Sequence, residues 1–130
     1  MTDKTRVHPS GYAEPKAALS QGIISGGFLF VSGAVAFHPE TGEIVGDDIA
    51  TQTRQVMENV RAVLREAGLD FDDVVQSRAY LTRIQEDFPT FDAVYREFFS
   101  EPLPARSTIG VELAIPGLVV EVDVMARLRS

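Results

Sequence analysis

The C-terminal segment, residues 118–128, alternates apolar and polar side chains along its length. A period of two is the pattern of a β-strand with one face in a core. One side of this strand would carry Val120, Val122, Val124, Ala126 and Leu128, and the other Glu121, Asp123, Met125 and Arg127. The chain must therefore build a sheet with one apolar face for other elements to cover and one face that is partly polar.

Two short β-prone runs near the N-terminus enclose a pair of glycines. Residues 23–25 and 28–31 flank Gly26 and Gly27, which accept the positive φ values of a tight turn. We expect a further strand over residues 34–37, ended by the turn-forming residues 39–42. The pattern predicts an antiparallel hairpin followed by a turn.

Two amphipathic helices can cover the apolar face of the sheet. The first begins at a cap on Asp47 or Asp48, keeps its apolar residues on one stripe, and stops at Gly68. A strand over residues 74–82 separates it from the second helix. We expect the second helix to open at Asp87, with Pro89 in its first turn.

The second helix carries an aromatic stripe formed by Phe88, Phe91, Tyr95, Phe98 and Phe99. On a helical wheel Asp92 lies at the edge of this stripe. Two interpretations stay open: the carboxylate turns out to water, or it borders a pocket.

The last two strands, expected over residues 107–113 and 118–128, flank a turn with Pro116 and Gly117. A hairpin centred on this turn would place Arg106 opposite Met125 and Gly110 opposite Glu121. Arg106 and Glu121 would then lie about 13 Å apart along the strands, which is too far for one chain to close a small site.

Composition limits the class of protein. A chain of 130 residues predicts one domain, with residues 1–18 loosely ordered because they are polar and broken by prolines. A net charge of −7 disfavours a nucleic-acid partner, and the absence of cysteine excludes thiolate chemistry. We see no signal peptide and no apolar run long enough for a membrane span, so a cytoplasmic protein with no membrane partner is expected.

Arg106 and Glu121 are the best candidates for chemistry. Arg106 follows Pro104 at the start of a strand, and its planar fork of N–H donors fits a carboxylate bidentately. Glu121 interrupts an apolar run, and two interpretations of Asp123 on the same side stay open: it raises the affinity of either carboxylate for a proton, or it is solvated. Judged alone, each residue is more often a surface or ion-pair residue. His8 and His38 are isolated, so no metal site is expected.

Several blocks in one order resemble the RidA family, also called YjgF/YER057c/UK114. The resemblance covers about residues 19–128 and rests on Phe30-Val31-Ser32-Gly33, His38 to Glu43, Ala67-Gly68-Leu69, residues 91–99, Pro104-Ala105-Arg106-Ser107 and Val120-Glu121-Val122 after Pro116. It implies a chorismate-mutase-like α+β fold, with a mixed sheet and two helices packed on one face. It also implies a homotrimer whose sites lie between subunits, with Arg106 from one chain and Glu121 from its neighbour.

The resemblance assigns roles to seven residues. Arg106 and Glu121 would be catalytic, and the substrate-binding residues would be Arg106, Ser32, Gly33, Thr108, Leu19 and Asp92. Three of these depart from the best-known imine deaminases of the family: Leu19 stands for a tyrosine, Asp92 for an asparagine and Thr108 for a cysteine. These changes affect the groups around the substrate rather than the arginine and the glutamate.

The resemblance therefore implies a hydrolase for 2-imino and enamine acids such as 2-iminobutanoate. Arg106 would hold the substrate carboxylate, Glu121 would act as general base on a water, and no cofactor would be required. One alternative is a specialised deaminase of 2-aminomuconate or of aminoacrylate. Another is a trimer that binds small carboxylates or a partner without turnover.

Overall fold

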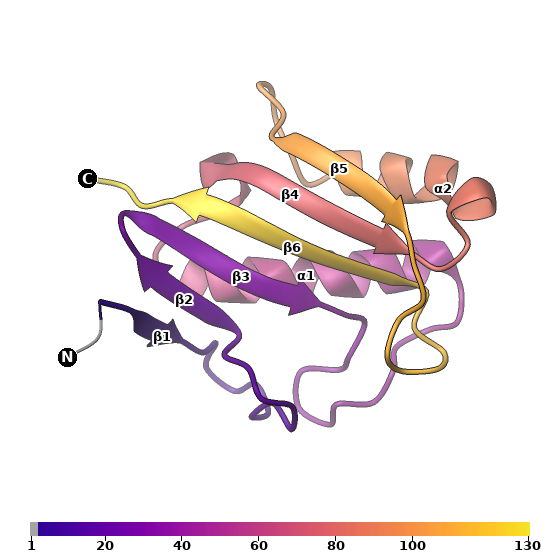
Figure 1. Ribbon diagram of the computed structural model, residues 1–130, viewed down its shortest axis with the longest axis horizontal. Helices are drawn as coiled ribbons and strands as arrows, with labels where there is room; N and C mark the ends of the chain where they lie inside the picture. Colours follow the sequence, from indigo (N-terminus) through magenta and orange to yellow (C-terminus); the bar gives the residue numbers. More distant parts are fainter. Residues whose placement is uncertain (1–2) are drawn as a thin grey trace.

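The alternating C-terminal segment forms β6 (Val120–Arg127), an interior strand of a six-stranded sheet (Figure 1). In the computed structural model, which describes residues 3–130, Val120, Val122, Val124 and Ala126 are buried and the residues between them are not. The other elements, in chain order, are β1 (Thr5–Val7), β2 (Gly22–Ser25), β3 (Phe28–Ala34), α1 (Ile49–Glu66), the 3-10 turn η1 (Phe71–Asp73), β4 (Val74–Leu81), α2 (Ile84–Arg96) and β5 (Ala105–Gly110).

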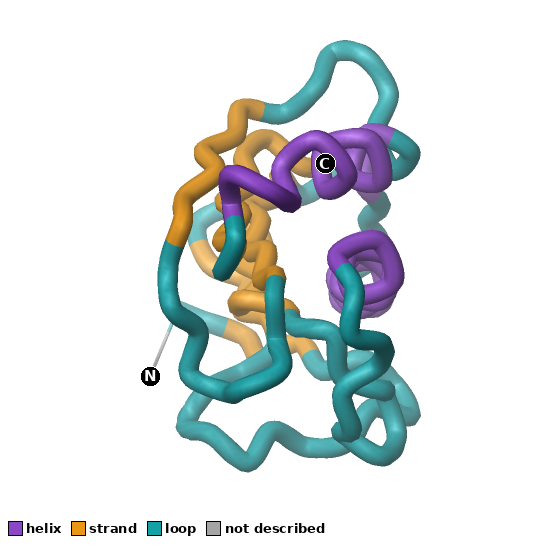
Figure 2. The backbone as a smooth tube through the Cα atoms, turned by 90° about the vertical axis from the view of Figure 1, so that its right-hand side faces the viewer, coloured by secondary structure: helices purple, strands orange, loops and turns teal. Residues whose placement is uncertain are grey.

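Both α-helices lie on the same side of the sheet, which leaves the opposite sheet face uncovered in the single chain (Figure 2). The strand order is β1-β2-β3-β6-β4-β5. β4 and β5 run parallel, whereas every other neighbouring pair is antiparallel, so the sheet is mixed. The predicted α+β class, with two helices packed on one face, is confirmed.

Local signals placed the first helix and the first hairpin correctly. The carboxylate of Asp48 accepts a hydrogen bond from the backbone N–H of Thr51 at the start of α1, as an N-cap does. Gly68 follows the helix with a φ of 77°. Gly26 and Gly27 turn the chain between β2 and β3, both with positive φ. These elements depend on neighbours in sequence, which is why a pattern could predict them.

The second helix begins earlier than predicted. It starts at Ile84, three residues before the expected start at Asp87, so Pro89 lies inside the helix. Asp87 does not cap the helix, because its buried carboxylate pairs with Arg83 one turn earlier, at 3.5 Å. Ile84 packs against the core, and burial of the first turn outweighs the hydrogen bond that Pro89 cannot donate.

The predicted hairpin between the last two strands is wrong. β5 pairs with β4 only, and β6 lies between β3 and β4 (Figure 1). The physical reason is the crossover: α2 connects β4 to β5, and a helix that packs on a sheet returns the chain parallel to the strand that it left. The free edge of β4 then takes β6. β5 and β6 therefore do not pair with each other, although they are close in sequence.

Two smaller differences concern the N-terminal part. The chain leaves the sheet after Ala34, so the strand predicted over residues 34–37 is absent and only Phe37 bridges to Ile44. The sequence did not predict β1, which lies in the segment expected to be loosely ordered and pairs with β2. The hydroxyl of Tyr12 in this segment donates to Asn59 on α1. Over the described residues, no helix is long and apolar enough to span a bilayer.

Candidate active site

Arg106 lies near the start of β5, and its side chain turns under α2. Its register partner on β4 is Ser77, which is fully buried, so Arg106 shares the sheet face that the helices cover. The guanidinium carbon lies 4.7 Å from the ring centroid of Tyr95 and 5.6 Å from those of Phe88 and Phe91. These rings orient the planar cation and screen it from water, which leaves its side chain 20% exposed.

Asp92 is the anionic partner of this arginine. Its Oδ1 accepts a hydrogen bond from Nη1 of Arg106 at 2.9 Å, and its Oδ2 lies 3.4 Å from Nη2 of Arg96. Burial acts to raise the pKa of Asp92, but the hydrogen bonds and charges of Arg106 and Arg96 outweigh it and lower the pKa. Asp92 therefore borders a pocket and is not turned away into water.

A cavity of about 210 Å³ opens beside Arg106. Its lining residues are Asp92, Tyr95, Arg96, Leu103, Pro104 and Arg106. The hydroxyl of Tyr95 is 2.6 Å from that of Ser77, which fixes the ring beneath the guanidinium. Thr108 follows two residues after Arg106 on the same face, opposite the buried Ala79. We call Asp92, Arg106 and Thr108 the arginine cluster.

Sequence reasoning missed Tyr95 and Arg96 at this cavity, and it missed Ser77, which bonds to Tyr95. The aromatic stripe of α2 indicated only a core face, because a ring that packs in a core and a ring that supports a cation have the same helical spacing. The one available signal was the spacing of Asp92 and Arg96, four residues apart on one helix face.

Glu121 lies on the other face of the sheet. Its register partner on β4 is Tyr80, three residues from Ser77 and therefore on the opposite side of the strand. A β-carbon at Gly33 on β3 would collide with the carboxylate of Glu121, so the absence of a side chain there makes room for the acid. Burial, and then the charge of Asp123, raise the pKa of Glu121.

Ser32 lies on the Glu121 side of the sheet, and Leu19 directly precedes a residue that Ser32 contacts. The hydroxyl of Ser32 donates to the backbone carbonyl of Ser20, which follows Leu19 directly. Leu19 is 47% exposed. We call Leu19, Ser32, Gly33 and Glu121 the glutamate cluster. The seven predicted residues thus fall into two groups, with Glu121 and Gly33 in contact in one and Arg106 and Asp92 in contact in the other.

The two clusters cannot form one pocket within the chain. β4 lies between β5 and β6, so Arg106 is two strands from Glu121 and three residues away along the sheet. This corresponds to roughly 14 Å between backbones, with the two side chains on opposite faces. The predicted register, with Arg106 opposite Met125, was wrong because the hairpin was wrong. The inference that one chain does not bring the pair together is nevertheless supported by this different geometry.

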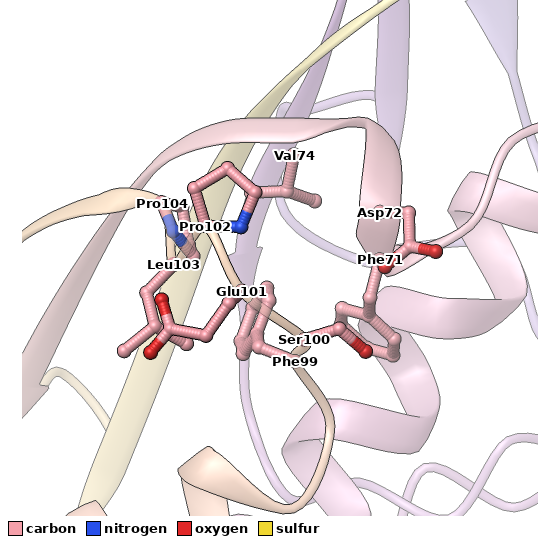
Figure 3. A pocket seen from close by; sticks show the side chains of 9 residues that line it. All are labelled: Phe71, Asp72, Val74, Phe99, Ser100, Glu101, Pro102, Leu103 and Pro104. Carbon is pink, nitrogen blue, oxygen red and sulfur yellow. The ribbon is translucent and has the colours of Figure 1, made fainter.

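A second cavity, of about 300 Å³, contains none of the predicted site residues (Figure 3). It lies between η1 and the segment that leads from α2 to β5. Phe71 and Phe99 form part of its wall, and Asp72 and Glu101 lie on different sides of it and do not converge (Figure 3). Leu103 and Pro104 line both this cavity and the cavity beside Arg106.

Comparisons with known proteins find relatives over most of the chain. A family model described as Endoribonuclease L-PSP matches residues 11–128. A proposed regulator named AldR from Lactococcus lactis is 46% identical over 110 residues, which cover 85% of this chain and 86% of the relative. A RutC family protein from Pyrococcus horikoshii is 40% identical over 113 residues, which cover 87% and 89% of the two chains.

Solved structures show the same fold. The crystal structure of RidA from an Antarctic Psychrobacter is 30% identical, with a TM-score of 0.87, and the match covers 95% of this chain and 99% of that one. The chain is therefore a small α+β protein whose fold is shared with RidA from Psychrobacter. The chain belongs to the RidA family, also called YjgF/YER057c/UK114.

Proposed function

We propose that this protein hydrolyses reactive 2-imino and enamine acids to 2-oxo acids and ammonia. The observation that carries the proposal is Arg106, a largely buried guanidinium that lies 4.7 Å from the ring centroid of Tyr95 at the edge of a small cavity. Such a fork is suited to grip a carboxylate and to fix the adjacent C=N carbon. Family membership supports the reaction class.

In this mechanism Glu121 acts as general base. Its raised pKa brings the carboxylate closer to the pH at which it works, and so improves its ability to accept a proton from water. As the water oxygen bonds to the imine carbon, the C=N electron pair moves to nitrogen, and the proton that Glu121 takes from water passes to that nitrogen. Loss of the second O–H proton then forms the C=O bond of the 2-oxo acid while the C–N bond breaks and ammonia leaves. The imine carbon is already electrophilic, so positioning and proton transfer are sufficient without a cofactor.

The site is proposed to lie between subunits of a homotrimer. Arg106 and Glu121 sit on opposite faces of one sheet, so a neighbouring copy must supply the second residue. The uncovered sheet face also carries exposed apolar side chains: Phe30, opposite Met125, is 42% exposed, and Ile109, opposite Tyr80, is 44% exposed. Burial of such residues against another copy would stabilise an oligomer.

A second candidate is a non-catalytic trimer that binds small carboxylates. The relative named as a proposed regulator favours this candidate, as does Asp92, because it already occupies one N–H of Arg106. Deamination of 2-aminomuconate or aminoacrylate is the enzymatic alternative. A nucleic-acid substrate is disfavoured, because a charge of −7 repels phosphates.

A coupled assay tests turnover and the role of Arg106 together. A threonine dehydratase would generate 2-iminobutanoate, and semicarbazide would trap the imine that remains. Arg106→Ala should abolish acceleration of the hydrolysis, and Arg106→Lys should restore little, because an ammonium cannot replace the planar fork. Arg54→Ala, which removes an exposed arginine paired with Glu97 on the helix layer, is the matched control and should keep full activity. Full activity in Arg106→Ala would contradict the proposal.

A further inference from the structure

The cavity beside Arg106 carries an uneven set of charges. Two arginines, Arg96 and Arg106, and one carboxylate, Asp92, line it, which gives a net charge of +1 if all three are ionised. The rest of the lining comes from Tyr95, Leu103 and Pro104, which offer mainly apolar surface. One carboxylate on a ligand would neutralise the charge of this cavity. The rest of that ligand would then contact the apolar side chains of the lining.

Asp92 is held in place by both arginines. One of its oxygens bonds to Arg106 at 2.9 Å and the other lies 3.4 Å from Arg96, so the carboxylate bridges the two cations. Its side chain is 28% exposed, and its lowered pKa keeps it ionised at neutral pH. The bridge also consumes one N–H of Arg106, so a ligand must use the other donors of the fork.

We propose that Asp92 determines specificity by restricting the arginine cluster to ligands with a single carboxylate. The inference rests on the proposed function and names the substrate class of the same site: imines of aliphatic monocarboxylic amino acids, as opposed to diacids such as the imines of aspartate or glutamate. In this proposal Asp92 discriminates between monoacids and diacids, whereas Arg106 binds the carboxylate that both share.

Electrostatics gives the physical reason. A diacid of four or five carbons places its second carboxylate within several ångströms of the first, in a small cavity that already holds Asp92. Like charges at such distances in a partly desolvated site repel strongly enough to cost about tenfold or more in affinity. The Glu121 that a neighbouring copy would contribute adds a further negative charge, which acts in the same direction.

Stable 2-oxo acids allow the inference to be tested without turnover. Calorimetric titration would compare 2-oxobutanoate with 2-oxoglutarate on the wild-type oligomer and on three variants. Asp92→Asn removes the charge at nearly constant shape, Asp92→Glu keeps the charge, and Glu86→Gln removes an exposed carboxylate from the same helix as a control for net charge. Circular dichroism of each variant would establish that the fold is retained.

We expect the wild type, Asp92→Glu and Glu86→Gln to prefer the monoacid. Asp92→Asn should shift the affinity ratio toward the diacid by about tenfold, with most of that shift lost in high salt. An unchanged ratio in folded Asp92→Asn, or an equal shift in Glu86→Gln, would overturn the inference. If Asp92→Asn does not fold, equal binding of both acids by the wild type would overturn it.

The result separates this inference from the proposed function. Selective binding of the monoacid without imine hydrolysis would leave the inference standing and reject the enzyme. Equal hydrolysis of monoacid and diacid imines by the wild type would keep the enzyme and reject the inference. Binding of neither acid to the wild type would overturn the inference and contradict the carboxylate clamp as well.

Discussion

The charged groups of the two clusters differ in their partners. In the arginine cluster, Arg106 has a carboxylate partner, aromatic rings and a helix above it. Beside the glutamate cluster, Arg78 and Tyr80 each donate a hydrogen bond to Asp123 at 2.9 Å and none to Glu121, whose pKa is raised by burial and then by the charge of Asp123. Arg106, whose charge is balanced by a carboxylate, is suited to binding. Glu121, which has another carboxylate nearby, is suited to accepting a proton.

Hybrid oligomers would test the separation of the two clusters with the largest effect. Arg106→Ala and Glu121→Gln proteins should each be inactive alone. After the two are unfolded and refolded together, random mixing should restore about a quarter of the sites, since each restored site takes Arg106 from one chain and Glu121 from another. Activity in the imine assay measures the recovery, and sedimentation equilibrium measures the stoichiometry. Confirmed mixing without recovery would contradict a shared site.

Gly33→Ala should disturb the glutamate cluster while leaving the arginine cluster intact. The added methyl group would collide with the carboxylate of Glu121, and Gly33 does not have positive φ, so the backbone itself tolerates alanine. Displacement of a general base by about 1 Å can cost up to roughly a hundredfold in rate, so kcat should fall by about tenfold or more with little change in KM.

The matched control is Gly110→Ala, because a methyl group there meets the side chain of Ile84 and not Glu121. It should keep kcat near the wild-type value, and binding of 2-oxobutanoate should be alike in both variants. Equal kcat values for the two glycine variants would show that the space beside Glu121 is not needed.

Asp123→Asn should shift the pH dependence of the reaction. Asp123 adds to the effect of burial in raising the pKa of Glu121, so removing its charge lowers that pKa. A general base works when ionised, and the acid limb of kcat/KM should therefore move to lower pH. The measurement is a pH profile with the spontaneous hydrolysis subtracted at each pH. Asp72→Asn, which changes an aspartate at the second cavity, serves as control and should leave the limb in place.

The sequence predicted local structure better than strand partners. Asp48, Gly26 and Gly68 act on residues a few positions away, so their signals identified α1 and the first hairpin. The partner of β5 depends on how α2 returns the chain across the sheet, and nothing within residues 105–127 encodes that. The motifs around Arg106 and Glu121 predicted that both residues lie on strands. The spacing of Tyr95 predicted only an aromatic residue in the core. Its contact with Arg106 exists only once α2 packs on β5.

The smallest effect should come from Leu19, an exposed member of the glutamate cluster. A leucine offers no hydrogen bond to a substrate side chain, so we expect imines of aliphatic amino acids to be preferred over polar ones. Leu19→Tyr should change the relative turnover of imines made by an amino-acid oxidase from leucine, methionine and glutamine by a few-fold, the order of one weak hydrogen bond. Thermal unfolding should be nearly unchanged, because the side chain is half exposed. Equal wild-type rates for the three imines would count against the preference. In that case the polarity of the substrate side chain would matter less at this position than the charge that Asp92 places beside Arg106.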